Sequence, residues 1–283
     1  MKNKIVQFIR SADNLKEMIR APLFLADTLN KNLELSLIME IRYEFGYHMA
    51  FPLTTGLTSM EYAGQMELYK AEAEKKVSDF LAKNQDLLEG RTVTFEVLTG
   101  ITEEILWEKS KNPESYLIII SEKEDQPKDF ISGVFHTLSE SPGCPVMLIP
   151  AHYESKPLKN ILYSTNYNEE DFDTLNKLSE FASPYNAHIT ALHITDKLDM
   201  DEKLKIKGFE TMVGEKVNYK DISFTVYPYS DIEEGIMEYS IRTKAELIVV
   251  LKENKGFIDN LIHGSHSKRI LKKAELPVMV FGS

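Results

Sequence analysis

Hydrophobic and polar positions follow two alternating patterns along the chain. Short apolar runs, such as 247–251, are typical of strands that are buried on both faces of a parallel sheet. Between them lie segments with apolar residues three and four positions apart, as at Phe172, Leu175 and Leu178, which predict amphipathic helices. Because strands and helices alternate, the pattern predicts a doubly wound α/β architecture with right-handed crossovers.

The same alternation is found in both halves of the chain. In the second half we expect strands at 160–164, 188–194, 223–227, 247–251 and 278–281, and helices at 169–185, 201–217, 231–243 and 265–274. In the first half we expect strands at 4–9, 33–41, 92–98, 116–121 and 146–150, and helices at 14–30, 59–84 and 102–111. Each half is therefore expected to form a five-stranded parallel sheet.

Segments of the first half return in the second half in the same order. The segment 115–120 (SYLIII) returns as 245–250 (AELIVV), and 144–149 (CPVMLI) returns as 276–281 (LPVMVF). The spacing between matching segments changes along the chain, as expected for homologous domains whose loops differ in length. The last strand of each copy is apolar and would otherwise be an exposed edge, so we expect these two strands to pair.

The repeat predicts two tandem domains, at 1–150 and 157–283, which agrees with the length of the chain. The linker between them is short, so the domains should pack closely. The first copy has a longer connection between its second and third strands. This connection includes the aromatic segment 42–58, which is either a loop folded over its own domain or a lid over a partner or ligand.

Composition and charge exclude several classes of function. The chain is 43% hydrophobic and 27% charged, as in ordinary globular proteins, and its net charge is −11, which argues against binding nucleic acid. Cys144 is the single cysteine, so no internal disulfide can form. We expect it to be an inert core thiol. We find no signal peptide and no apolar run long enough for a membrane span, and we expect a cytoplasmic protein.

The titratable residues do not form a recognisable catalytic or metal-binding motif. His188 and His193 are five positions apart on a predicted strand and would point to opposite faces, so we expect His193 to be a packed or hydrogen-bonded core residue. The acidic pairs at 103–104 and 233–234 lie where the first turn of a helix is expected, where they complement the helix dipole. We therefore expect no catalytic residues and no metal site.

Three features together resemble the universal stress protein family. They are the run 247–250 (LIVV) before a loop, Gly264-Ser265 before the last helix, and the closing segment 276–280 (LPVMV). The resemblance covers the chain as two tandem copies. It implies two five-stranded domains with the universal-stress-protein-like, adenine-nucleotide alpha-hydrolase-like fold. It also implies that the two final strands meet, giving a pseudo-dimer within one chain.

Nucleotide-binding members of this family carry a Gly-x2-Gly-x9-Gly-Ser/Thr motif after the fourth strand. In this chain the first two glycine positions are occupied by Leu251 and Asn254, and only Gly264-Ser265 remains. A glycine followed by free N–H groups at a helix start can bind phosphate. The same pair also makes a good helix N-cap without any ligand, so both interpretations stay open.

The family also has an aspartate beside the nucleobase, at the end of the first strand. The second half has Ser164-Thr165-Asn166 at that place, and an asparagine can still hydrogen-bond an adenine edge. Both motifs fall at the carboxyl ends of strands, where an open α/β sheet binds its ligand. The candidate nucleotide-binding residues are Ser164, Thr165, Asn166, Ile194, Gly264, Ser265 and His266.

The first half departs further from the family pattern. Its fourth strand is followed by an acidic segment, 121–129, which would repel a triphosphate. Asp13 could be a shifted version of the base-contacting acid. We therefore expect that the first domain has lost nucleotide binding.

Two functions are consistent with these residues. The first is a degenerate universal-stress-type protein without catalysis, acting in the stress response as an interaction module or a small-molecule-binding module. The alternative is a stress sensor that binds ATP or AMP in the second domain only. Protein partners or a homodimer fit either function, whereas nucleic acid and membranes do not. No cofactor is certain, and ATP or AMP in the second domain is the candidate.

Overall fold

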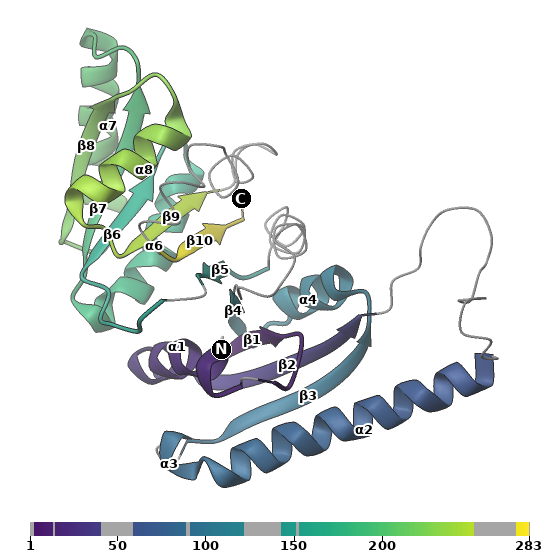
Figure 1. The fold of residues 1–283 in the computed structure, drawn as a ribbon. Helices are drawn as coiled ribbons and strands as arrows, with labels where there is room; N and C mark the ends of the chain where they lie inside the picture. Colours follow the sequence, from purple (N-terminus) through teal and green to yellow (C-terminus); the bar gives the residue numbers. More distant parts are fainter. Residues whose placement is uncertain are drawn as a thin grey trace.

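The chain forms one ten-stranded sheet in which two five-stranded halves are joined edge to edge (Figure 1). The computed structural model describes residues 3–13, 15–40, 59–88, 91–121, 143–150, 153–251 and 276–282. The strand order is β3-β2-β1-β4-β5-β10-β9-β6-β7-β8. Within each half all neighbouring strands are parallel, as the alternation of strands and helices predicts.

The two halves have the same strand order, read outward from their junction. The first half consists of β1 (Lys4–Ile9), α1 (Leu15–Thr28), β2 (Asn32–Glu40), α2 (Ser59–Lys83), α3 (Gln85–Leu88), β3 (Val93–Gly100), α4 (Thr102–Lys111), β4 (Ser115–Ser121) and β5 (Val146–Ile149). The second half consists of β6 (Asn160–Ser164), α6 (Glu170–Ala182), the 3-10 helix η1 (Ser183–Tyr185), β7 (His188–Thr195), α7 (Met200–Lys216), β8 (Ile222–Pro228), α8 (Ile232–Thr243), β9 (Leu247–Leu251) and β10 (Val278–Phe281).

These elements agree with the sequence prediction to within a few residues at each end. One difference is at 169–185, predicted as one helix, where the chain turns into η1 at Ser183. Pro184 follows there and cannot donate to an α-helical hydrogen bond, which favours the tighter helix. The predicted helix 265–274 and the aromatic segment 42–58 lie outside the described residues.

The last strands of the two halves pair directly, which confirms the prediction from their apolar character. β5 and β10 are antiparallel, and Met147 lies opposite Met279. All four residues of each strand are buried. The pairing removes two apolar sheet edges from solvent and makes the sheet continuous across the chain.

Residues before β6 are fixed to the second half by a single carboxylate. Oε2 of Glu246 accepts hydrogen bonds from the backbone N–H groups of Lys159, at 2.6 Å, and Asn160, at 3.1 Å. Its other oxygen is 3.2 Å from Nζ of Lys156. These contacts hold the end of the connection between the halves against the start of β9.

Helices cover both faces of the sheet and bury two hydrophobic clusters. One face packs against α1, α6 and α7, with Ile19, Leu175 and Phe209 among the buried side chains. The other face packs against α4 and α8, through Leu106 and Ile236. This layering leaves the carboxyl ends of the parallel strands between the helix layers, where ligands of open α/β sheets bind.

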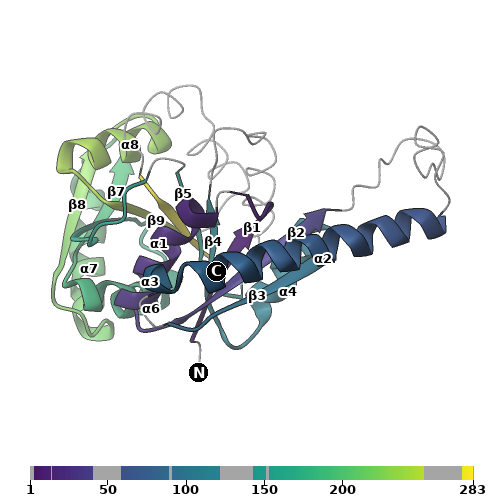
Figure 2. The same ribbon diagram turned by 60° about the horizontal axis from the view of Figure 1, so that its bottom comes forward.

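The helix α2 is longer than its contact with the sheet. Its second half packs along β3 through Val77 and Leu81, which are buried. Further toward its start, Leu68 and Tyr69 are exposed, and Figure 2 shows this part of α2 extending beyond the sheet. The extra length of the first half therefore lies at the outer end of the molecule, away from the β5–β10 junction.

Candidate functional site

The carboxyl ends of β6 and β7 bring four of the predicted site residues together. Ser164 is the last residue of β6 and lies next to Leu192 of β7 and Val250 of β9. The backbone N–H of Thr165 donates to the carbonyl of Leu192 at 2.9 Å, which extends the contact between the strands. Asn166 follows and is exposed. The remaining predicted residues, Gly264, Ser265 and His266, lie outside the described residues.

Ile194, near the end of β7, has its side chain on the face covered by α8. It is 5% exposed and belongs to the hydrophobic cluster of that face. It packs so closely against Gly235 of α8 that a Cβ there would lie 3.0 Å from Cγ2 of Ile194. Ile194 is therefore at the predicted edge, but its side chain is part of the core.

A buried aspartate, Asp171, organises the loop that follows β6. Its Oδ1 accepts a hydrogen bond from the hydroxyl of Tyr163, and its Oδ2 accepts one from the hydroxyl of Thr165 at 2.6 Å. Oδ2 also accepts from the backbone N–H of Asn168 at 2.9 Å. Because the carboxylate is in the first turn of α6, the helix dipole favours its negative charge. Asp171 therefore holds the loop through hydrogen bonds to Tyr163, Thr165 and Asn168.

The same loop is fixed from β7 by His193. Nδ1 of His193 is 2.8 Å from the backbone carbonyl of Thr165. A carbonyl can only accept, so this contact requires the proton on Nδ1. The loop chain then turns at Tyr167, which has a left-handed backbone conformation, with φ of 63°. Its ring lies 4.4 Å from the ring of His193 and 5.2 Å from the ring of Phe209.

Glu202 of α7 contacts the ring of His193, which packs against Tyr167. Its Oε2 is 3.5 Å from Nε2 of His193, and its Oε1 is 2.6 Å from Nζ of Lys205. Burial and the nearby Glu202 charge both raise the pKa of the Tyr167 hydroxyl above its usual value. Tyr167 is therefore neutral at physiological pH and contributes a packed ring to the site.

This arrangement holds the loop rigidly but does not form a catalytic triad. Thr165, His193 and Asp171 are residue types found in such triads. Here, however, the hydroxyl of Thr165 donates to Asp171, and His193 contacts the Thr165 carbonyl instead of its hydroxyl. His193 is therefore not placed to take the Thr165 proton, and the carboxylate that accepts this hydrogen bond, Asp171, is fully buried. The Thr165 hydroxyl and the Asp171 carboxylate are engaged with each other, whereas the Tyr167 hydroxyl is buried without a hydrogen-bond partner among the described residues.

Leu251, which occupies a glycine position of the family motif, is part of the core. It is 6% exposed, lies at the end of β9 opposite Phe281, and belongs to the larger hydrophobic cluster. The side chain at this position therefore contributes to the hydrophobic interior of the protein.

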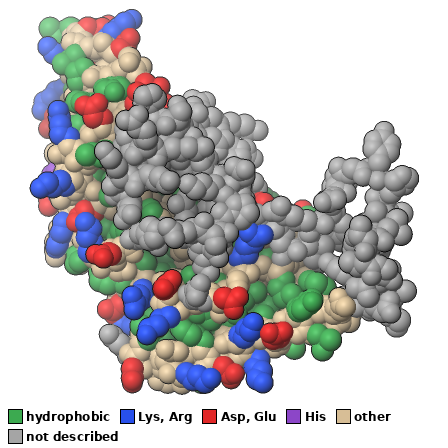
Figure 3. Space-filling view, viewed as in Figure 1, with side chains coloured by type: hydrophobic (Ala, Val, Ile, Leu, Met, Phe, Trp, Pro, Cys, Tyr) green, Lys and Arg blue, Asp and Glu red, His purple; other side chains and the backbone are tan. Residues whose placement is uncertain are grey.

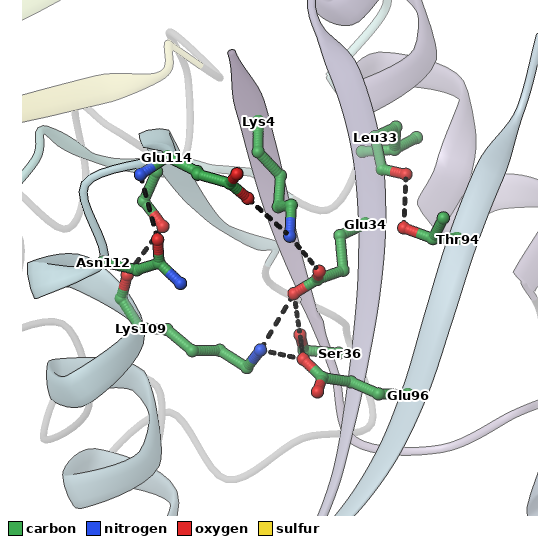
Figure 4. A network of polar contacts seen from close by, with 10 residues as sticks. Lys4, Leu33, Glu34, Ser36, Thr94, Glu96, Lys109, Asn112 and Glu114 are labelled. Carbon is green, nitrogen blue, oxygen red and sulfur yellow. Dashed lines mark hydrogen bonds and ion pairs between the residues drawn. The ribbon is translucent and has the colours of Figure 1, made fainter. Parts of the chain in front are cut away.

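Sequence reasoning missed a network of charged residues in the first half (Figure 4). Oε1 of Glu34 is 2.8 Å from Nζ of Lys109, and Oε2 of Glu34 is 2.8 Å from Nζ of Lys4. Lys109 also contacts Glu96, and the hydroxyl of Ser36 donates to Glu96 at 3.1 Å. Burial raises the pKa of Glu34, but hydrogen bonds from Lys109 and Lys4 outweigh it and leave this pKa below its usual value.

The sequence did contain a signal for this network. In 32–37, Glu34 and Ser36 alternate with leucines, so one face of β2 is polar beneath a helix. The repeat of the chain has apolar or aromatic residues at the corresponding positions of the second half. Val226 on β8 corresponds to Glu96, and Tyr239 on α8 corresponds to Lys109. The two halves thus use different chemistry between the sheet and this helix layer.

The other predicted features of the first half are placed as follows. Asp13 lies after β1 and accepts a hydrogen bond from the hydroxyl of Ser11 at 2.8 Å, and Nζ of Lys76 lies 3.9 Å from it. Cys144 is buried, as expected for a core thiol. The acidic segment after Ser121 lies outside the described residues.

Charges of both signs are spread over the surface. Figure 3 shows Lys and Arg interspersed with Asp and Glu on the described part of one face. Within the described ranges, no three His, Cys, Asp or Glu residues are grouped so that they could hold a metal ion. No helix in that part of the chain is both long and apolar enough to cross a membrane.

Comparison with known proteins relates the second half of the chain to a family. Residues 157–282 match the model of the universal stress protein family. A universal stress protein from Archaeoglobus fulgidus DSM 4304 is 12% identical, with a TM-score of 0.66, and the match covers 100% of this chain and 97% of that protein. A functionally unknown protein from Pseudomonas aeruginosa PAO1 is 14% identical, with a TM-score of 0.58, and the match covers 99% and 92% of the two chains.

A third solved structure with this fold is a domain of a transport protein. The cytoplasmic domain of a prokaryotic cation chloride cotransporter is 10% identical, with a TM-score of 0.53, and the match covers 99% of this chain and 95% of that one. No curated protein matches the chain significantly. At these identities the solved structures show a shared fold. Residues 157–282 therefore belong to the universal stress protein family, and the first half of the chain repeats the strand order of this family domain.

Proposed function

We propose that the protein is a universal-stress-type module without catalysis, which binds a small molecule or a protein segment at the carboxyl edge of β6 and β7. The match of residues 157–282 to the universal stress protein family supports a role in a stress response. The observation that carries the proposal is the hydrogen-bonded loop around Asp171. This loop uses its own hydroxyl and carboxylate groups to hold its shape and presents Asn166 to solvent.

A rigid loop with an exposed amide suits recognition. The loop loses little conformational entropy on binding, because hydrogen bonds with Asp171 and His193 already fix its conformation. An amide supplies both donors and an acceptor, so Asn166 can pair with a nucleobase edge or with a peptide group. Nucleophilic chemistry would require a hydroxyl that a substrate can reach, whereas Thr165 and the Asp171 carboxylate to which it donates are both buried.

The alternative function, an ATP or AMP sensor in the second half, is favoured by the position of Asn166. It follows β6 at the carboxyl edge of the sheet, where an adenine would bind in an open α/β fold. An asparagine amide can form two hydrogen bonds with the edge of adenine. This alternative makes the same amide the recognition group and differs from the first proposal in the identity of the ligand.

Calorimetric titration with AMP and with ATP distinguishes the two functions. The sensor function requires one site per chain, weakened about three- to tenfold by Asn166→Ala, the loss expected for one hydrogen bond. Asn168→Ala is the matched control, since Asn168 is also exposed in this loop and uses its backbone N–H to contact Asp171. Absence of heat with both nucleotides would favour another ligand.

Catalysis is tested separately by following phosphate release from ATP. We expect no turnover above buffer with the wild-type chain. Turnover that is lost in Thr165→Val, while the variant remains folded by circular dichroism, would contradict the proposal. That result would mean that the Thr165 hydroxyl leaves Asp171 when substrate is bound.

A further inference from the structure

One edge of the ten-stranded sheet is open in the described part of the chain. β8 is the last strand and, among the described residues, it pairs with β7 alone (Figure 1). An open edge presents a row of N–H and C=O groups that can pair with another strand. This feature is independent of the site at the ends of β6 and β7.

The hydrogen bonds to β7 show which groups of β8 point outward. The carbonyl of Asp221 accepts from the N–H of Ile189, and the N–H of Tyr229 donates to the carbonyl of Thr195. In a parallel ladder alternate residues bond to one neighbour. Ile222, Phe224 and Val226 therefore direct their backbone groups away from β7. Pro228, which lacks an N–H, is also in this outward set, as proline at an edge should be.

Apart from Pro228 at its end, β8 lacks the features that block edge pairing. Natural edge strands commonly carry charged side chains, especially lysine, yet 222–228 (ISFTVYP) has none. The opposite edge of the sheet is different. There β3 contains Glu96, and α2 packs along the strand. The two ends of the sheet are therefore unequal, and β8 is the end suited to pairing.

The sequence of β8 is complementary to itself in antiparallel pairing. A twofold axis at Thr225, the midpoint of the strand, places Thr225 opposite Thr225 of a second copy. It also places Phe224 opposite Val226 and Ser223 opposite Tyr227. These are aromatic–β-branched and hydroxyl pairs, which stabilise antiparallel sheets, and no like charges meet. The outward groups of Phe224 and Val226 then face each other and can exchange hydrogen bonds.

The helices beside β8 add apolar surface to the same end of the molecule. α7 packs on one face of β8 and α8 on the other. Their exposed hydrophobic side chains include Leu204, at 63%, and Met212, at 40%, on α7, and Ile241, at 47%, on α8. Continuing the sheet across a twofold axis would bring α7 alongside its copy and α8 alongside its copy, which would bury part of this surface.

The strand edge is also ordered in advance. The hydroxyl of Tyr227 donates to Glu238 of α8 at 2.8 Å, and the guanidinium of Arg242 lies 4.8 Å from the Tyr227 ring. These contacts fix Tyr227 on the α8 face of the sheet. A preordered edge loses less conformational entropy when it pairs.

From these observations we propose that β8 is a homodimerisation edge: two copies of the chain pair β8 with β8 in antiparallel register around Thr225. A twofold contact of this kind is closed, so it gives a dimer rather than a filament. A foreign extended peptide could also add to the edge, but the self-complementary register and the absence of charge favour a second copy.

The test uses the full-length chain, its variants, and sedimentation velocity over a range of protein concentrations. The wild-type chain should be a dimer that dissociates on dilution. Thr225→Lys places two like charges directly opposite each other and should weaken dimerisation about tenfold or more. Thr99→Lys is the control, because Thr99 is an exposed threonine on the opposite edge strand β3, and it should leave the dimer unchanged.

A charge exchange makes the test specific for the register. Thr225→Lys and Thr225→Glu should each be mainly monomeric, and mixing them should restore a dimer containing one copy of each. Circular dichroism confirms that each variant is folded. A monomeric wild-type chain, a dimer unaffected by Thr225→Lys, or folded variants that fail to dimerise when mixed would each overturn the proposal. Dimerisation of the mixture at wild-type strength or above would support it.

Discussion

The hydroxyl of Thr165 donates a 2.6 Å hydrogen bond to Oδ2 of Asp171, which is fully buried in the first turn of α6. This contact joins the end of β6 to the helix that follows it. It also buries the hydroxyl of Thr165, a residue that is 3% exposed, against a carboxylate of the following helix. The relationship supports a site that recognises a ligand with a fixed loop and an exposed amide.

Asp171→Ala should destabilise the second half substantially. The change leaves the hydroxyls of Tyr163 and Thr165 without their buried acceptor, and we expect a loss of about 2–4 kcal/mol in the free energy of unfolding. Urea denaturation measures this loss. Asp173→Ala is the control, because Asp173 is in the same helical turn but exposed, and it should cost less than about 1 kcal/mol. Equal losses of unfolding free energy in both variants would show that the charge acts through the helix dipole and not through the hydrogen bonds of Asp171.

The charged network at Glu34 should make stability depend on pH in the acidic range. The pKa of Glu34 is lower in the folded chain than the ordinary value of 4.5 for a glutamate. Its stabilising contribution is therefore fully present above that value and is lost as the pH falls through the lower, folded pKa. Glu34→Gln should cost about 1–3 kcal/mol at neutral pH, and the difference from wild type should shrink below pH 4.5.

The control for this prediction is Glu104→Gln, which changes an exposed carboxylate in the first turn of α4. Its difference from wild type should be small throughout the titration. A Glu34→Gln difference that stays constant down to strongly acidic pH would mean that the contacts with Lys109 and Lys4 do not set the pKa of Glu34.

Leu251→Gly should lower the free energy of unfolding far more than a substitution in an exposed loop. The side chain is buried against the sheet interior, so removing it leaves a cavity, and we expect a loss of at least about 2–5 kcal/mol. Thermal denaturation measures the effect, with Leu68→Ala as the control because Leu68 is exposed. A loss below about 1 kcal/mol would indicate that the end of β9 can relax, and that a glycine could be restored there without unfolding the domain.

The fold was largely predictable from sequence because strong periodic patterns determine it. Buried runs such as 117–120 and 247–250 gave the central strands, and the repeat gave the same order in each half. The pairing of β5 with β10 followed from their apolar character. The domain limits 1–150 and 157–283 stay a prediction, since one continuous sheet joins the two halves.

The site was less predictable, because side-chain contacts between distant segments do not show in local patterns. The positions of Ser164, Thr165 and Asn166 at a strand end could be predicted from the sequence. That Asp171 would bind the Thr165 hydroxyl, and that Ile194 would face α8, depends on tertiary packing. For the same reason the motif alone does not show that Leu251 lies in the core.

Native mass spectrometry of the full-length chain, after incubation with a small-molecule and protein extract of stressed cells, tests the central claim most directly. The account predicts one bound partner per chain, released on denaturation, lost in Asn166→Ala and retained in Asn168→Ala. A wild-type chain that stays bare, two equivalent ligands per chain, or a bound ligand that is indifferent to Asn166→Ala would contradict binding at the edge of β6 and β7.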